Sequence, residues 1–175
     1  MVGAKSEITL ETLVDGEQGK LIRLKLPDYN SPHWQMLGPA DEKNPVGFYN
    51  ITDTLKDIAK SYKVAHMQIQ PPHTTMRIIL NEAEEGYLKD RARNLQEQFP
   101  ADRAYDHNEN HFPEYCKNGH AHLMADTLPL IQGLLVSDGS LDLGNYLSAF
   151  AMDLYPLEEG KVRYVDVMII GVLKK

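Results

Sequence analysis

The sequence predicts a single compact α+β domain that consists mostly of antiparallel strands with about two helices. Three observations lead to this prediction. The 175 residues match the usual size of one domain and can bury enough apolar surface to form a core. Several short segments alternate between apolar and polar residues, as strands with one buried face do. Two other segments carry apolar residues at the spacing of an amphipathic helix.

The N-terminal part of the chain is predicted to form a β-hairpin followed by a loop. Two alternating stretches, ITLETLV and KLIRLKL, lie between Glu7 and Leu26 and are separated by the turn-forming residues 15–19. Proline and glycine then become frequent in residues 27–47, where we expect a long surface loop or an insertion.

The next two segments are predicted to form a helix and a strand. Residues 51–62 have apolar side chains at helical spacing, and Thr52 or Asp53 is placed to cap the N-terminus of this helix. Residues 64–70 alternate and run into two prolines, which cannot donate to a sheet ladder. We therefore expect the prolines to end the strand.

A second strand and a second helix should follow, and the C-terminal part should be mainly β-structure. Residues 76–80 are a strand candidate, and the second helix is predicted at about 85–99. Residues 100–120 are polar and are predicted to form a loop with little regular structure. Residues 121–131 fit neither pattern cleanly, so helix and strand both stay open. The stretches after residue 131 are β-like and are separated by turns.

Composition limits the partners and the compartment. With 18 Lys and Arg against 25 Asp and Glu, the chain has a formal charge of −7, so we expect no nucleic-acid partner. The only cysteine is Cys116, which excludes an intrachain disulfide and suits a reducing compartment. No apolar stretch approaches the roughly 20 residues that span a bilayer. We therefore expect a cytoplasmic protein with no membrane partner.

The histidines are the main chemical signal in the sequence. Four of the seven lie between positions 107 and 122. Three histidines around one divalent ion, with an open position for substrate, form a recurrent catalytic arrangement. If residues 120–122 form a strand, His120 and His122 point to the same face and could bind one ion together. The alternative is that these histidines are polar loop residues without a ligand.

Two other polar groups follow or close predicted strands. Pro72-His73-Thr74-Thr75 comes directly after a strand, where its hydroxyls and imidazole could bind an oxyanion or orient a substrate. The alternative is a turn in which a threonine caps the next segment. Asn81-Glu82 closes the following strand and could supply a carboxylate base, although such a pair more often starts a helix.

Several of these segments belong to a set of ordered motifs. In chain order they are Ile51–Leu55, Pro72–Thr75, Asn81-Glu82, Tyr105–Asn108, Asn118–Leu123, Val136–Leu141 and Leu143-Gly144. Together they resemble the YjbQ family, the UPF0047 group, which is described as secondary thiamine-phosphate synthase. The resemblance covers about residues 48–172 and depends on the order and spacing of the motifs.

The resemblance implies a β-rich homotrimer with a polar pocket near a protomer boundary, and it assigns roles to residues of this chain. The implied catalytic residues are His73, Glu82, His107 and His122. The implied residues for binding a phosphorylated substrate are Thr74, Thr75, Asn81, Asn118 and Gly144. The implied ligands of a divalent metal ion, zinc or magnesium, are His73, His107, His120 and His122.

The sequence departs from the family pattern at three places, which indicates a divergent member. Met76 replaces a small alanine, Met124 replaces a lysine, and Asn145-Tyr146-Leu147 replaces Thr-Trp-Gln. The lost lysine and glutamine would be donors to a phosphate. Since the chain is also acidic, we expect a metal ion and neutral hydroxyls to hold a phosphorylated ligand.

The resemblance implies a metal-dependent transferase that acts on phosphorylated small molecules. Two alternatives stay open. One is a cupin-like metalloenzyme, because His120, His122, Asp126 and Gly133 imitate the first cupin motif, although the second motif has no counterpart. The other is a non-catalytic trimeric protein whose histidines hold a metal or an anion.

Overall fold

Two antiparallel sheets form the framework of the protein. The structure is a computed structural model that describes residues 8–17, 19–38, 45–110, 117–156 and 162–173. In spatial order, the six-stranded sheet contains β1 (Thr9–Asp15), β2 (Lys20–Lys25), β10 (Tyr164–Leu173), β5 (Tyr62–Gln70), β7 (Gln132–Ser137) and β8 (Ser140–Leu141). The four-stranded sheet contains β3 (Trp34–Leu37), β4 (Val46–Asn50), β9 (Leu147–Asp153) and β6 (Met76–Glu82).

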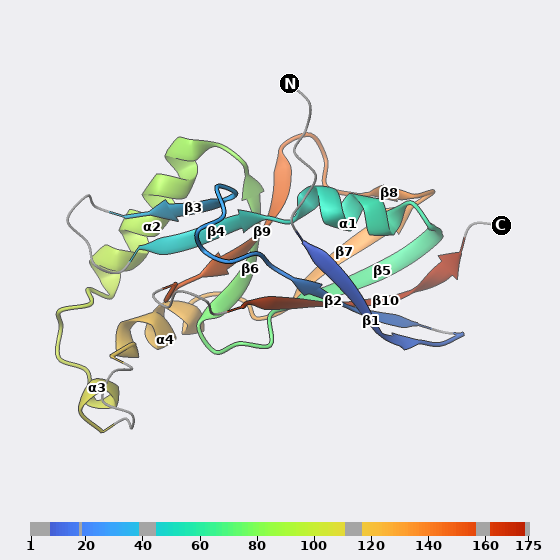
Figure 1. Cartoon of the computed structure of the whole chain (residues 1–175). Helices are drawn as coiled ribbons and strands as arrows, with labels where there is room; N and C mark the ends of the chain where they lie inside the picture. Colours follow the sequence, from blue (N-terminus) through green and yellow to red (C-terminus); the bar gives the residue numbers. More distant parts are fainter. Residues whose placement is uncertain (1–7, 18, 39–44, 111–116, 157–161, 174–175) are drawn as a thin grey trace.

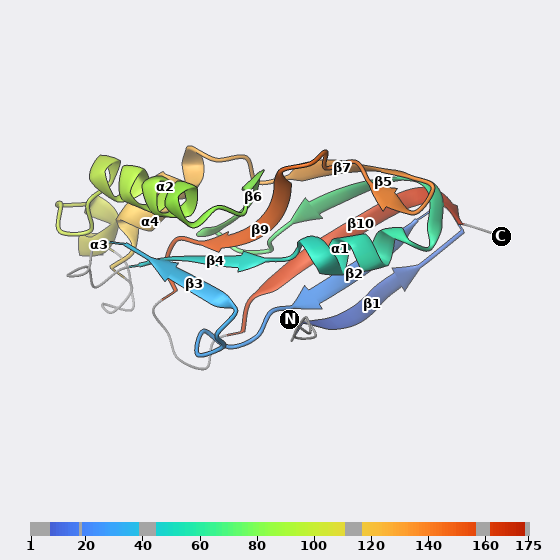
Figure 2. The same cartoon turned by 90° about the horizontal axis from the view of Figure 1, so that it is seen from above.

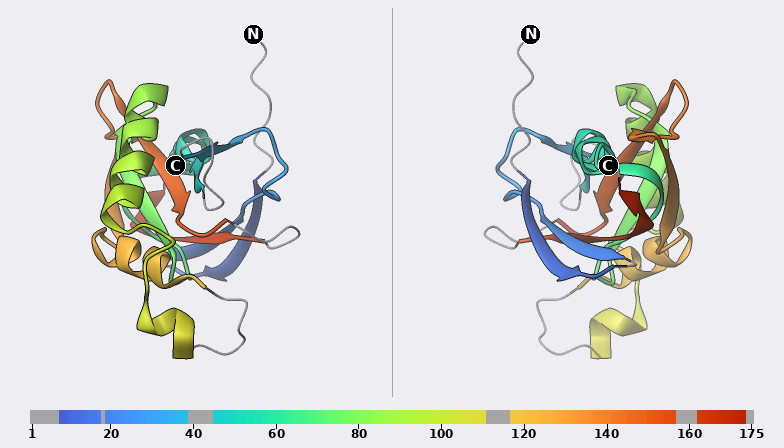
Figure 3. Two further views of the ribbon diagram at one scale, coloured as in Figure 1. Left: turned by 90° about the vertical axis from the view of Figure 1, so that its left-hand side faces the viewer. Right: turned by 90° about the vertical axis from the view of Figure 1, so that its right-hand side faces the viewer.

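Helices cover these sheets at different places. In the described ranges there are four: α1 (Thr52–Ala59), α2 (Glu85–Gln98), α3 (Asp106–Asn110) and α4 (Gly119–Asp126). Seen from above, α1 lies over the six-stranded sheet, whereas α2 and α4 lie beside the four-stranded sheet at the other end (Figure 2). The short helix α3 projects beyond α4 (Figures 1 and 3). No helix in the part of the chain that the structure describes is long and apolar enough to cross a membrane.

The four-stranded sheet contributes to two hydrophobic cores because its residues alternate between faces. Tyr49 and Ile78 belong to the core that this sheet shares with α1 and the six-stranded sheet. Their neighbours Phe48 and Ile79 point the other way, into the core formed with α2 and α4. Strand β6 is therefore buried on both faces near its start, and this position holds the loop before it in place.

Most of the predicted elements are confirmed. The N-terminal hairpin is β1 paired with β2, the strands predicted at 64–70 and 76–80 are β5 and β6, and the helix at about 85–99 is α2. The helix predicted at 51–62 is α1, but neither proposed residue caps it. Ile51 occupies the cap position, and the Asn50 side chain accepts a hydrogen bond from the Thr52 N–H at 2.9 Å.

Three expectations about the middle of the chain are wrong. Residues 27–47 are not only a loop, because Trp34 and Tyr49 face each other across the β3–β4 pair and both are buried. The segment 100–120 contains α3, and the ambiguous stretch after it begins inside α4. The described ranges thus hold four helices where about two were expected. Residues 111–116, which include His111 and Cys116, lie outside the described residues.

Candidate functional site

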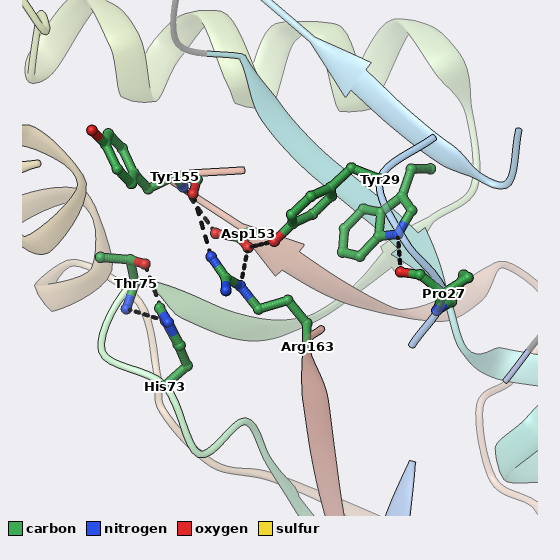
Figure 4. A network of polar contacts seen from close by, with 8 residues as sticks. Pro27, Tyr29, His73, Thr75, Asp153, Tyr155 and Arg163 are labelled. Atoms are coloured by element: carbon green, nitrogen blue, oxygen red, sulfur yellow. Dashed lines mark hydrogen bonds and ion pairs between the residues drawn. The ribbon is translucent and has the colours of Figure 1, made fainter. Parts of the chain in front are cut away.

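The loop between β5 and β6 holds the first group of predicted site residues in a fixed geometry. The Nδ1 atom of His73 accepts a hydrogen bond from the Thr75 backbone N–H at 3.2 Å, and the Thr75 hydroxyl lies at the same distance (Figure 4). Thr75 is buried, and its carbonyl accepts from the Leu154 N–H at 2.9 Å. The loop is therefore attached to the segment that follows β9.

This hydrogen bond determines the tautomer of His73. A backbone N–H is always a donor, so Nδ1 must carry a lone pair and the neutral ring has its proton on Nε2. A metal-bound histidine has the opposite pattern, because its second ring nitrogen normally donates to a carbonyl or carboxylate. In this geometry the Nδ1 atom of His73 is used in a hydrogen bond to the backbone.

A second group is held together by contacts between α3 and α4. Nε2 of His107 lies 3.0 Å from Oδ1 of Asn118, and the Gly119 N–H donates to Oδ1 of Asn108 at 2.9 Å. A Cβ atom at Gly119 would come within 2.8 Å of Cβ of Tyr105, so this close approach needs glycine. The Tyr105–Asn108 and Asn118-Gly119 motifs thus position each other across the segment between them.

His120 and His122 lie on opposite sides of α4, so the expectation that they share one face is wrong. Residues two apart in an α-helix point about 200° apart. The ring of His122 lies 4.7 Å from that of His107, between centroids. His120 is 1% exposed and packs between the rings of Tyr105 and Tyr155, at 6.3 and 5.8 Å.

Burial also keeps His120 uncharged. Neither of its ring nitrogens has a hydrogen-bond partner among the described residues. Burial, with a smaller effect of His122, lowers the pKa of His120 to about 4. His120 is therefore neutral at neutral pH and belongs to the packing between α4 and the chain after β9.

Three of the predicted residues, His73, Thr74 and His122, line one open cavity of about 630 Å³. It lies where β5 ends and β6 begins, and α4 forms one wall. His107 adjoins this group through its ring contact with His122. A volume of this size is typical of small-molecule sites, which lie between about 300 and 1,000 Å³.

Arg77 and Asp126 also line this cavity, and Arg77 was not among the residues predicted from the sequence. Arg77 follows Met76 in the apolar stretch MRIIL and is only 8% exposed. Burial lowers its pKa, and the nearby Asp126 acts in the opposite direction. The one available signal was a charged residue in a strand that is otherwise apolar.

The other predicted residues lie at the far end of β6. Asn81 and Glu82 pair with Ser148 and Leu147 at the start of β9, and Gly144 lies in the loop before it with a φ of 60°. The six residue steps from Met76 to Glu82 span about 20 Å in a strand. Within one chain, Asn81, Glu82 and Gly144 are thus not brought together with the histidines.

The four histidines predicted as metal ligands do not fit a common metal ion in this chain. The described residues contain no group of three or more His, Cys, Asp or Glu side chains that could hold one. Nδ1 of His73 accepts from the Thr75 N–H, and His120 is buried on the far side of α4. The cupin-like alternative is also wrong, because it needs His120 and His122 on a strand and they lie on a helix.

The fold and the cavity define a class of α+β protein with two antiparallel sheets and a histidine-lined cavity at the start of β6, an edge strand of the four-stranded sheet. The chain belongs to the family described as UPF0047 protein YjbQ-like, which matches residues 40–171. A UPF0047 protein of Methanothermobacter thermautotrophicus is 29% identical over 118 residues, which cover 66% of this chain and 79% of that protein.

Solved structures of similar proteins have the same fold. A YbjQ-like protein of unknown function from Sulfolobus solfataricus has a TM-score of 0.67 and 23% identity, covering 87% of this chain and 99% of that one. An uncharacterised conserved protein of the YjbQ/UPF0047 family from Clostridium acetobutylicum has a TM-score of 0.61 and 27% identity, covering 71% and 92%.

Proposed function

We propose that this chain is an enzyme of the secondary thiamine-phosphate synthase type, which handles phosphorylated small molecules in the cavity at the start of β6. One observation carries the proposal. His73, Thr74 and His122 come from two separate motifs of the family resemblance and line one cavity of suitable volume.

The proposed reaction joins two phosphorylated substrates. The bond between the methylene carbon of a hydroxymethylpyrimidine and its diphosphate breaks, and the electron pair leaves with the diphosphate. The ring nitrogen of a thiazole phosphate then donates its lone pair to that carbon. His122 would donate a proton to the departing diphosphate, and the Thr74 and Thr75 hydroxyls would bind phosphate oxygens. The predicted zinc or magnesium ion would enter as the counterion of the diphosphate, because the described histidines do not form a site for it.

We also propose a homotrimer, as the family resemblance implies. The outer face of the six-stranded sheet supports self-association, because exposed apolar side chains lie on neighbouring strands there. Ile170 of β10 is opposite His66 of β5, which is opposite Leu135 of β7, and Val172 is opposite Val64. The two ends of β6 lie about 20 Å apart, so Glu82 could join the cavity only from another copy.

The test is the coupling of hydroxymethylpyrimidine diphosphate to thiazole phosphate, measured as thiamine phosphate formed in the presence of magnesium. We expect His122→Ala to lower kcat/KM by about 10² or more, the usual contribution of a general acid. The matched control is His33→Ala, a histidine outside the cavity, which should stay within about twofold of wild type. Wild-type protein that forms no product above the uncatalysed rate would overturn the proposal.

A second candidate is a non-catalytic protein that binds a small anion in the same cavity. The separation of Glu82 from the histidines favours it, since no carboxylate that the resemblance predicts as catalytic reaches the cavity in one chain. This protein would bind phosphate compounds in the cavity without converting them.

A further inference from the structure

The environment of Arg77 differs from that of the other buried arginine. Arg163 is 7% exposed and forms an ion pair with the buried Asp153, at 2.6 Å between Nε and Oδ2. Arg77 is equally buried, but it donates only to backbone carbonyls. Its Nε bonds to Ala125 O at 2.9 Å, and its Nη1 bonds to Thr74 O and Met76 O at 3.0 and 2.7 Å.

The positive charge of Arg77 is therefore held in place without being neutralised. Among the described residues, Arg77 has no carboxylate within ion-pair distance, and Asp126 acts on it only through space. Buried charges in proteins are normally paired, because removal from water is costly. Nη2 donates to none of the described residues, and the side chain lines the same cavity as His73, Thr74 and His122.

We propose that Arg77 is the anion-recognition residue of this cavity and that its Nη2 binds a phosphoryl oxyanion of the ligand. A guanidinium makes short, charge-assisted hydrogen bonds to phosphate oxygens. The three hydrogen bonds to backbone carbonyl oxygens hold the Arg77 guanidinium in place, so the side chain loses little conformational freedom when an anion binds. The choice of a phosphoryl group rests on the proposed function, whereas the role of Arg77 rests on its geometry.

The same arrangement bears on position 124, where this chain has Met124 and the resemblance expects a lysine. Met124 is buried in the core of α4 and the four-stranded sheet, so this position directs no charge into the cavity. Arg77 reaches the carbonyl of the next residue, Ala125, from strand β6. Arg77 on β6 thus places a positive charge next to position 124 of α4, where the resemblance expects a lysine.

Binding of inorganic phosphate and pyrophosphate, measured by calorimetry at constant ionic strength with EDTA, tests this assignment. We expect Arg77→Met to weaken binding by roughly tenfold or more, and Arg77→Lys to weaken it less, because the charge stays but the fork is lost. Asp126→Asn should tighten binding by about twofold to fivefold, since it removes a negative charge from the cavity wall. The control Arg93→Met removes an exposed arginine on α2 and should change affinity by less than about twofold.

Either of two results would overturn the assignment: a folded Arg77→Met variant with wild-type affinity, or wild-type protein that binds neither anion. If Arg77→Met does not fold, as judged by circular dichroism, the folded Arg77→Lys variant decides, since wild-type affinity in that variant would also overturn the assignment. Pyrophosphate binding through Arg77 without formation of thiamine phosphate would refute the proposed enzyme and keep the anion site. Product formation with an unchanged KM for the diphosphate in Arg77→Lys would refute the anion site and keep the enzyme.

Discussion

Strand β6 carries predicted site residues at both of its ends, and the two ends have different surroundings. At the first end, Thr75 and Met76 are buried, and the loop is attached to α4 and to the chain after β9. At the second end, Asn81 is half-buried and Glu82 is exposed, with β9 as the paired neighbour. One chain therefore preorganises only part of the set of residues that the family resemblance assigns to the site.

A buried polar network accounts for much of this order at the first end. Oδ2 of Asp153, at the end of β9, accepts from Nε of Arg163 and from the hydroxyl of Tyr29, and Oδ1 accepts from the Tyr155 N–H (Figure 4). Asp153 lies opposite Met76 in the β6–β9 pair. The network thus joins the chain before β3, the end of β9 and the start of β10 beside the His73 loop.

The largest expected effect comes from breaking the Arg163–Asp153 ion pair. Arg163→Met leaves the Asp153 carboxylate buried without its cation, and breaking a buried pair in this way costs about 3–5 kcal/mol. The melting temperature should fall by about 6–20 °C for a chain of this size. Hydrogen exchange should accelerate at residues 73–77 more than at Asn81 and Glu82.

The matched control is the exposed Lys60–Asp57 pair at the C-terminal end of α1. Asp57→Asn should leave the melting temperature within about 1 °C of wild type, because exposed ion pairs contribute little. If hydrogen exchange in Arg163→Met accelerates equally at both ends of β6, the buried network does not order the first end more than the second.

His120 provides a smaller effect at the same end, and it depends on pH. Its pKa is about 4 in the folded protein, whereas the ordinary pKa of an exposed histidine is 6.5. Between these values the unfolded chain binds a proton that the folded chain does not, so stability falls as the pH is lowered from 6.5 to 4. The free energy of unfolding falls by about 3 kcal/mol over this pH range because of His120.

The variant His120→Phe should remove this contribution while keeping a ring between Tyr105 and Tyr155. Urea unfolding of both proteins across this pH range gives the comparison. The free energy of unfolding of the variant should fall less steeply toward acid than that of the wild type. Parallel curves would show that His120 is not buried in its neutral form.

Local pattern predicted the elements whose residues repeat regularly. Strands β5 and β6 and helix α2 were predicted because one face of each is continuously apolar. Residues 121–131 were ambiguous because their apolar residues fit neither spacing, and the structure shows that the stretch joins the end of α4, at Asp126, to the loop before β7. Strand β3 was missed because it is four residues long and its pairing with β4 is set by tertiary contacts that composition does not report.

The candidate site was predicted in part for the same reason. His73, Thr74 and His122 belong to ordered motifs, so they could be named before the structure. Arg77 belongs to none of these motifs, and the significance of its charge depends on the carbonyls around it. The order of the motifs does not give the distance between them. Glu82 is separated from the histidines because the full length of β6 lies between them.

Mixed oligomers test whether the second end of β6 is completed by another copy. His122→Ala removes a cavity residue at the first end, and Glu82→Gln removes the carboxylate at the second. If a site takes His122 from one copy and Glu82 from the next, each variant alone is inactive. Refolding them together in equal amounts should restore about a quarter of the wild-type coupling activity, because about one site in four then has both residues intact. Mixed trimers that form but stay inactive would place both residues in the same chain, whereas a Glu82→Gln variant that is active on its own would remove Glu82 from the site.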